Sequence, residues 1–203
     1  MNNEEKNGWD YITEEVEKTY PNQKNPMHYG TMISWKLGGN DPLDGISIYD
    51  GGDYYHFVTY GLSELYEKET DNKEYSGYGM EFTLKLKKGN NDDLEIKNII
   101  NVLQTIARVT FTKGELFLAN EYLYTGQTNG MDASKKSNIT GFITIPDNNF
   151  KTINTPNGIV EFVEFIGCTD SELKAIVNKE ITVEELYNKI GSDITDYNRE
   201  AVI

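Results

Sequence analysis

An alternating segment, GMEFTLKLKKG at residues 79–89, constrains the fold more than any other part of the chain. Successive side chains of a β-strand point to opposite faces of its sheet. In this segment apolar and polar side chains alternate, with Met80, Phe82, Leu84 and Leu86 on one side and Glu81, Thr83, Lys85 and Lys87 on the other. We therefore predict a strand with one buried apolar face and one polar face turned to solvent.

A long amphipathic helix is predicted soon after this strand, from about residue 94 to residue 112. Asp92 and Asp93 precede it, where the helix dipole favours negative charge, and Gly114 follows it as a typical C-terminal cap. Its apolar side chains recur three or four positions apart and so share one stripe, made of Ile96, Ile99, Ile100, Leu103, Ile106 and Ala107.

Several shorter elements are predicted around this pair. A first helix runs from about Trp9 to Tyr20, and Pro21 stops it. Runs of aromatic and β-branched residues, divided by turn residues, predict strands at residues 31–37, 45–50, 54–60, 139–146 and 158–167. Two later helices each begin with a capping box, formed by Thr169 with Glu172 and by Thr182 with Glu185.

The order of these elements predicts the fold class. Strands and helices do not alternate regularly, which favours an α+β fold with a mixed, largely antiparallel sheet flanked by helices. Residues 126–138 show neither period and are expected to form a mobile loop rather than a linker, so a single domain spans residues 1–203. Glu161 and Glu164 lie on opposite faces of an ideal strand, which indicates a bulge or a two-sided environment there.

The charge balance limits the class of partner. The chain has 33 acidic and 19 basic residues, a formal net charge of −14, so direct binding to nucleic acid is not expected. An acidic surface can steer a basic partner towards the protein, although it can also serve solubility alone. The N-terminus lacks the features of a secretory signal, and no apolar run approaches the ~20 residues that span a bilayer. We expect a cytoplasmic protein that does not bind a membrane.

The segment GLSEL at residues 61–65 comes close to the G-x-S-x-G turn that presents a serine nucleophile in many hydrolases. Leu65 occupies the position of the second glycine, and both histidines, His28 and His56, precede Ser63 instead of following it. A hydrolase triad is therefore not expected. We interpret Gly61 as a residue with an unusual backbone angle, and Ser63 as a cap of the turn or of a short helix.

A metal site is conceivable but not supported by spacing. Imidazole and carboxylate groups both suit divalent ions, and His28 and His56 have several acidic neighbours in the sequence, namely Asp41, Asp44, Asp50 and Asp53. Their spacing matches no known ligand pattern, and histidines in such strands are usually packed or hydrogen-bonded. We predict no catalytic residue, no metal and no cofactor, and an enzyme ranks third among the functions considered.

Tyrosine is unusually dense in one part of the chain. The chain contains 14 tyrosines, many of them between residues 49 and 78. Tyrosine offers a large contact area and a hydroxyl group at low entropic cost, and it is enriched where proteins bind proteins. Half-buried sheet faces would also account for many of these rings.

The order of several motifs resembles the suppressor of fused family. The matching blocks are NDPLDGISIYD, YHFVTYGLSELY, SGYGMEFTLKL, NVLQTIARVTF, INTPNGIVEFVEFIGCTDSEL and SDITDYNRE. Together they span roughly residues 9–199. The resemblance implies the N-terminal domain of that family, without the C-terminal domain of the animal proteins.

This resemblance implies a binding protein rather than an enzyme. Animal members of the family hold a transcription factor of the Hedgehog pathway by clamping an extended peptide, which adds a strand to a sheet between two domains. The groove of the family lies along the segment matched here by residues 56–66. The candidate partner contacts that the resemblance implies are Phe57, Thr59, Glu64 and Tyr66.

Single-domain members that resemble this chain occur in bacteria, where the family is thought to include immunity proteins that neutralise polymorphic toxins. Many such toxins are basic or attack anionic substrates, so the acidic balance of this chain is compatible with that role. The expected partner is a cognate toxin domain. The alternative is a regulatory adaptor that captures an extended segment of a partner by strand addition.

Overall fold

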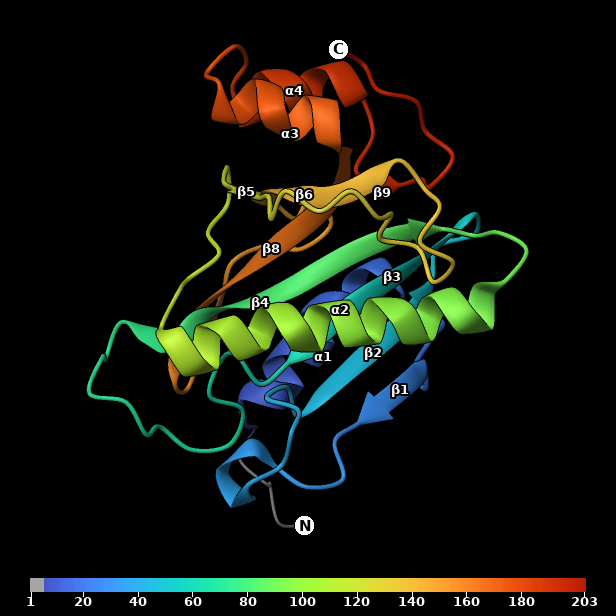
Figure 1. Cartoon of the computed structure of the whole chain (residues 1–203). Helices are drawn as coiled ribbons and strands as arrows, with labels where there is room; N and C mark the ends of the chain where they lie inside the picture. Colours follow the sequence, from blue (N-terminus) through green and yellow to red (C-terminus); the bar gives the residue numbers. More distant parts are fainter. Residues whose placement is uncertain (1–5) are drawn as a thin grey trace.

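Strand β4 (Tyr75–Lys87) crosses the middle of the sheet in this computed structural model, which describes residues 6–203 (Figure 1). Within that range the strand order is β1-β2-β3-β4-β8-β6-β5, with β7 beside β8 and β9 beside β4. β4 pairs in parallel with β8 and β9, and the other pairs are antiparallel. The remaining strands are β1 (Met27–Gly30), β2 (Gly45–Asp50), β3 (Tyr54–Tyr60), β5 (Tyr122–Leu123), β6 (Ile139–Pro146), β7 (Ile153–Thr155), β8 (Gly158–Thr169) and β9 (Ile194–Thr195).

Helices cover both faces of this sheet. The long helix α2 (Asp92–Lys113) lies across one face, and α1 (Gly8–Thr19) lies behind the sheet on the other (Figure 1). The short helices α3 (Asp170–Val177) and α4 (Val183–Ile190) pack on the end formed by β6 and β8. The structure confirms the predicted α+β class with a mixed, largely antiparallel sheet.

Most predicted elements form where the sequence patterns place them. The predicted apolar stripe of α2 is buried, and Gly114 ends the helix in the left-handed conformation. Both capping boxes form, at Thr169 and at Thr182. Residues 126–138 contain neither helix nor strand, and this loop is organised by Asp132, whose carboxylate accepts hydrogen bonds from the backbone of Lys136 and Ser137.

The prediction of a solvent-facing side on β4 is wrong. Glu81, Thr83 and Lys85 are all buried, and in the polar series only Lys87 is exposed. The second face is covered because α1 and the loop after β6 form their own apolar cluster against the sheet, centred on Ile12, Val16, Tyr49, Val58, Tyr60, Phe150 and Phe162. Glu164 on the adjacent β8 is buried in the same way, whereas Glu161 is exposed.

The predicted strand at residues 31–37 is also wrong. The pairing strand β1 ends at Gly30, and the chain then makes a 3-10 turn, η1 (Trp35–Leu37), closed by Gly38 in the left-handed region. Met32 and Ile33 are exposed, so their apolar character does not reflect a buried sheet face. Within residues 6–203, no helix has the length and apolar character needed to cross a membrane.

Candidate protein-binding groove

The chain turns sharply at Gly61, directly after β3. Gly61 has a φ of +126°, and a Cβ atom there would lie 2.7 Å from the backbone nitrogen of Asp44. Both facts favour glycine, because other residues rarely adopt this angle and would clash with the neighbouring loop. The expectation of an unusual backbone angle at Gly61 is confirmed, but residues 61–64 form a turn and no helix.

A buried carboxylate holds this turn in place. Glu81 of β4 is fully buried, and it accepts hydrogen bonds from the backbone of Gly61 at 2.9 Å and from the hydroxyl group of Thr59 at 2.7 Å. The backbone and hydroxyl of Ser63 also donate to it, at 3.0 and 2.6 Å. Burial raises the pKa of Glu81 to about 7, although these hydrogen bonds act in the opposite direction. Ser63 is therefore a structural turn residue.

Glu64 organises the segment that follows the turn. Its carboxylate accepts hydrogen bonds from the backbone of Glu69, Thr70 and Gly77 at 2.7, 2.6 and 3.0 Å, and it pairs with Lys68 at 2.8 Å. Burial opposes ionisation, but the ion pair with Lys68 and the backbone donors outweigh it and lower the pKa of Glu64 to about 2. Glu64 thus fixes the shape of the loop from within.

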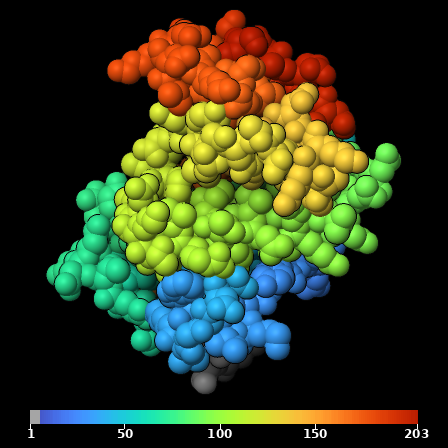
Figure 2. Space-filling view, in the orientation of Figure 1, coloured from blue at the N-terminus to red at the C-terminus, as the bar shows by residue number. Residues whose placement is uncertain are grey.

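The loop of residues 61–70, which these two carboxylates hold in place, forms one wall of a groove of about 760 Å³. η1 forms the opposite wall, and the ion pair of Lys36 with Glu69 joins the two walls. Figure 2 shows η1 in blue at the lower end of the molecule and the loop after residue 61 in teal beside it. Met32, Leu37 and Tyr66 line the groove with 99%, 81% and 62% of their surface exposed.

Aromatic rings form the floor of the groove. Phe111 at the end of α2 makes edge contacts with Trp35 of η1 and with Tyr78 of β4, at ring-centroid distances of 5.9 and 5.1 Å. Such edge-to-face pairs fix ring positions as well as burying area. The floor is therefore built from three elements that are far apart in the sequence, while the apolar rim remains open to solvent.

The structure places the four predicted contact residues very differently. Phe57 and Thr59 on β3 are both 0% exposed, and β3 is paired on both sides, with β2 and β4. Strand addition at β3 is therefore blocked. Glu64 and Tyr66 both line the groove, but the carboxylate of Glu64 is engaged with its own loop, so Tyr66 alone presents an exposed side chain.

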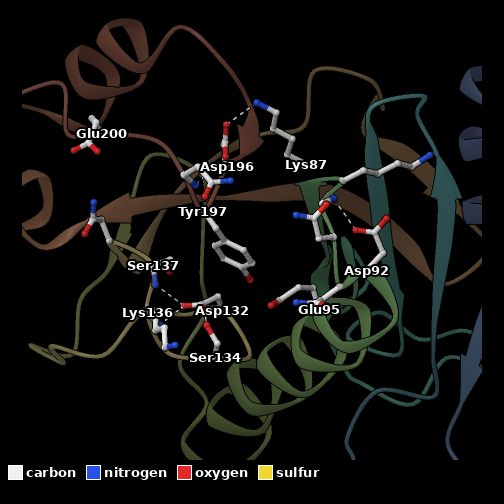
Figure 3. A pocket seen from close by; sticks show the side chains of 16 residues that line it. Lys87, Asp92, Glu95, Asp132, Ser134, Lys136, Ser137, Asp196, Tyr197 and Glu200 are labelled. Atoms are coloured by element: carbon white, nitrogen blue, oxygen red, sulfur yellow. Dashed lines mark hydrogen bonds and ion pairs between the residues drawn. The ribbon is translucent and has the colours of Figure 1, made fainter.

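A second concave region, of about 490 Å³, lies where α2 begins, beside β9 and the loop of Asp132 (Figure 3). The ring of Tyr197 points between Glu95 and Asp132 in this view. Most of the charged groups here already have partners, since Lys87 pairs with Asp196 at 2.7 Å and Glu95 accepts from the backbone of Ala133 at 2.9 Å. No apolar rim comparable to that of the groove is present among its lining residues.

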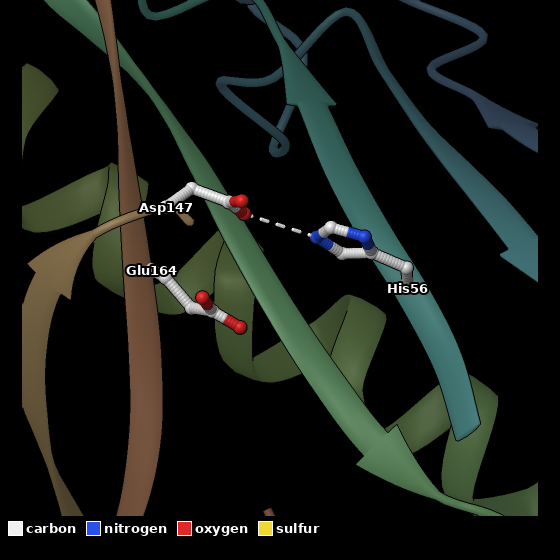
Figure 4. A group of neighbouring side chains, drawn as sticks. All are labelled: His56, Asp147 and Glu164. Atoms are coloured by element: carbon white, nitrogen blue, oxygen red, sulfur yellow. Dashed lines mark hydrogen bonds and ion pairs between the residues drawn. The ribbon is translucent and has the colours of Figure 1, made fainter. Parts of the chain in front are cut away.

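A cluster of ionisable side chains is buried inside the sheet, formed by His56, Asp147 and Glu164 (Figure 4). The two ring nitrogens of His56 contact Asp147 at 3.1 Å and the hydroxyl group of Tyr20 at 2.8 Å. Burial lowers the pKa of His56, although Asp147 raises it. Burial and the charge of Asp147 raise the pKa of Glu164 well above its ordinary value.

Lys85 already supplies a positive charge to this cluster. Its ammonium group lies 3.0 Å from a Glu164 oxygen and 2.7 Å from Asp193. Asp147 also accepts hydrogen bonds from Thr83 at 2.6 Å and from the backbone of Asn149 at 2.7 Å. The acidic residues near His56 in the sequence are not its partners, because its ring nitrogens contact Tyr20, just after α1, and Asp147, just after β6. This arrangement is an internal network whose charges are paired, although one oxygen of Glu164 has no hydrogen-bond partner among the described residues.

Sequence reasoning missed most of these site residues because their partners are distant in the chain. Glu164, an acidic residue inside an apolar strand, is a sequence signal for a buried ion pair. Its partner, Lys85, lies on another strand and could not be assigned from the sequence. The groove had a weaker signal, namely the apolar residues Met32, Ile33 and Leu37, whose pattern predicts a strand and not an exposed wall. An open groove with exposed apolar walls is typical of surfaces that bind macromolecules.

Comparison with known proteins identifies the family. The family model for Suppressor of fused protein matches residues 39–200, so the chain belongs to the suppressor of fused family. The suppressor of fused homologs of Homo sapiens and Mus musculus are each 27% identical over 172 residues. These matches cover 78% of this chain but 35% of each relative, so the chain corresponds to only part of their length.

Two solved structures share the fold. A crystal structure described as the Sufu-Fu complex has a TM-score of 0.81 and 26% identity, and the match covers 97% of this chain and 92% of that chain. The structure of Drosophila Suppressor of Fused has the same TM-score and identity, with coverage of 96% of this chain and 51% of that chain. The predicted family resemblance is confirmed.

Proposed function

We propose that this chain is a non-enzymatic protein-binding domain, and that it acts as an immunity protein that neutralises a cognate bacterial toxin. Membership of the suppressor of fused family supports the binding function, since one structural relative was solved as the Sufu-Fu complex. The observation that carries the proposal is the groove between η1 and the loop after β3, with Met32, Leu37 and Tyr66 exposed along it.

Exposed apolar side chains in a cluster require an explanation. Soluble proteins rarely leave several large apolar side chains exposed together unless the surface binds a partner. In this groove Tyr66 is the proposed direct contact, because its ring stands in solvent on a fixed backbone. Glu64 positions that backbone, and Phe57 and Thr59 support β3 from the interior, so all four residues contribute in different ways.

The charge of the chain favours a basic partner. A net charge of −14 creates a negative potential that accelerates the approach of a positively charged protein. Salt screens this attraction over about 10 Å at 0.1 M ionic strength. A toxin that acts on nucleic acid or on another anionic substrate would carry such a positive surface.

Co-expression tests this proposal directly. Cells would express the product of the gene adjacent to this one, with and without the chain, and the two proteins would then be co-purified. We expect toxicity that the chain relieves, together with a stable one-to-one complex. A harmless neighbour, or a neighbour that kills regardless of the chain, would overturn the immunity role.

The second candidate is a regulatory adaptor that binds an extended segment by strand addition. The sheet supports this alternative with its open edges, because β1 and β5 each pair on one side only within the described part of the chain. All four residues of β1 are exposed, and so is Tyr122 on β5. An unpaired edge offers backbone donors and acceptors to an added strand.

An adaptor of this kind should bind a short segment cut out of its partner. Hydrogen exchange of the chain with such a peptide would show protection along β1 or β5. Protection confined to the groove would instead favour side-chain recognition, and binding that requires the folded partner would exclude strand addition of an isolated segment.

A further inference from the structure

Asp44 lines the groove, and its carboxylate has no partner among residues 6–203. It stands in the loop that leads into β2, is half-buried, and lines the groove together with Trp9, Met32 and Tyr66. Among the contacts within residues 6–203, its carboxylate makes neither a hydrogen bond nor an ion pair. A carboxylate that loses part of its hydration without gaining a partner is destabilised in its charged form.

The backbone around Asp44 is fixed, which limits the positions that its carboxylate can take. The carbonyl oxygen of Asp44 accepts a hydrogen bond from the backbone of Thr31 at 3.0 Å. The preceding Leu43 is held by the buried side chain of Gln104 on α2, which accepts from its N–H at 3.1 Å and donates to its carbonyl at 3.3 Å. Preorganised groups of this kind lose little entropy on binding.

No lysine or arginine among residues 6–203 forms an ion pair with Asp44, although Lys36 lines the same groove. Burial raises the pKa of Asp44, and Lys36 opposes that rise, but the ammonium group of Lys36 is engaged with Glu69. Asp44 and Tyr66 line the same groove, and the charge of Asp44 adds to the effect of burial in raising the pKa of Tyr66. A cation bound at Asp44 would therefore lie in a groove that also contains the rings of Trp9 and Tyr66.

We propose that Asp44 recognises an arginine side chain of the protein partner, flanked in the partner by an apolar residue. This inference rests on the proposed protein-binding function and names the chemistry recognised at that site. Guanidinium groups pair with carboxylates through parallel hydrogen bonds and stack on aromatic faces, whereas the more strongly hydrated lysine does so less well. The apolar side chains of Met32 and Leu37 would cover the flanking apolar residue.

Charge complementarity supports this occupant over a neutral segment. Glu67 lines the same groove and has no ion pair among the described residues, so two acidic groups face the opening beside apolar walls. An arginine with an apolar neighbour satisfies both features, while a purely apolar segment would bury Asp44 without compensation. Hydrogen bonds to charged groups contribute about 1.5–3 kcal/mol, which corresponds to roughly 10- to 100-fold in affinity.

A tripeptide probe tests the inference on the intact chain. Acetyl-Leu-Arg-Leu-amide and its citrulline analogue, which is nearly isosteric but uncharged, would be titrated while backbone amide shifts are followed by NMR. We expect saturable shifts at Met32, Asp44 and Tyr66 with the arginine peptide, and about tenfold weaker binding of the citrulline peptide. Asp44→Asn should weaken the arginine peptide by a similar factor and leave the citrulline peptide unchanged.

Asp53→Asn is the matched control, because Asp53 is exposed in the turn between β2 and β3, outside the groove. It should bind both peptides as the wild-type chain does. Absent shifts, equal binding of the two peptides, or full binding by Asp44→Asn with an otherwise native spectrum would each overturn the inference. Failure of toxin rescue with intact arginine binding would instead remove the immunity role and leave this site standing.

Discussion

Ser63 donates two hydrogen bonds to the same oxygen of Glu81, one from its backbone nitrogen at 3.0 Å and one from its hydroxyl group at 2.6 Å. The two residues are 18 positions apart, and both are buried. This contact ties the loop that carries Tyr66 to the central strand of the sheet. It explains why a sequence close to a catalytic elbow serves structure instead.

Replacing Ser63 by alanine should destabilise the chain by about 1–3 kcal/mol, because a buried carboxylate loses a hydroxyl donor. The free energy of unfolding would be measured by urea titration. Ser171→Ala is the control, since Ser171 is exposed at the start of α3, and it should cost less than about 0.5 kcal/mol. Equal small effects of the two substitutions would contradict the structural role of Ser63.

Glu81 should make stability depend on pH in an unusual direction. Its pKa is raised from an ordinary value of 4.5 to about 7 in the folded chain. Between these values the folded chain holds a proton that the unfolded chain has released, so this group favours folding less and less as the pH rises. The resulting loss of unfolding free energy is complete above about pH 7 and amounts to about 3 kcal/mol.

Glu81→Gln should remove this contribution. The difference in unfolding free energy between the variant and the wild-type chain should therefore shift in favour of the variant between about pH 4.5 and pH 7. Asn101→Gln at an exposed position of α2 serves as the control, because it changes no ionisable group, and its difference from wild type should stay nearly constant over the same range. A flat difference curve for Glu81→Gln would count against a raised pKa.

Local patterns predicted the elements of this fold well, and tertiary contacts decided the rest. The stripe of α2 and the two capping boxes depend on residues three or four apart, so the sequence alone specifies them. The environment of Lys85 depends on Glu164 and Asp193, which lie on other strands or loops far along the chain. The alternation of β4 could not show that α1 would cover its polar face.

The candidate site was only partly accessible to sequence reasoning. The resemblance placed the binding surface along residues 56–66, and Tyr66 does lie at the groove. Phe57 and Thr59 lie on the same segment, but the sequence alone does not show that both are buried, because it does not reveal that both faces of β3 are covered. The sequence does not show that η1 forms a wall of the groove or that Asp44 lines it, because both depend on how the loop before β2 packs against the loop after β3.

Substitution of Phe57 should mainly affect stability, and substitution of Tyr66 should mainly affect partner binding. Phe57→Ala should lose about 3–5 kcal/mol of unfolding free energy, because the ring fills the core between the sheet and α2. Tyr66→Ala should stay within about 0.5 kcal/mol of wild type, yet weaken partner binding. Urea titration and calorimetry would measure the two properties. A strongly destabilised Tyr66→Ala would show that its ring serves the fold.

Lys85 should stabilise the chain mainly by neutralising buried carboxylates. Lys85→Met should cost about 3–5 kcal/mol, because Glu164 and Asp193 would lose their shared cation. Glu164→Gln should recover part of that loss in the Lys85→Met background, while it should be destabilising or neutral in the wild-type background. Strictly additive effects in this double-mutant cycle would exclude a direct interaction between the two side chains.

Calorimetric titration of the purified chain with the protein encoded beside it tests the central claim most directly. The protein-binding function predicts a one-to-one complex whose affinity falls as salt is added, is weakened by Tyr66→Ala and is unaffected by Asp53→Asn. No detectable binding by the wild-type chain at low and moderate salt would contradict the proposed toxin-neutralising role.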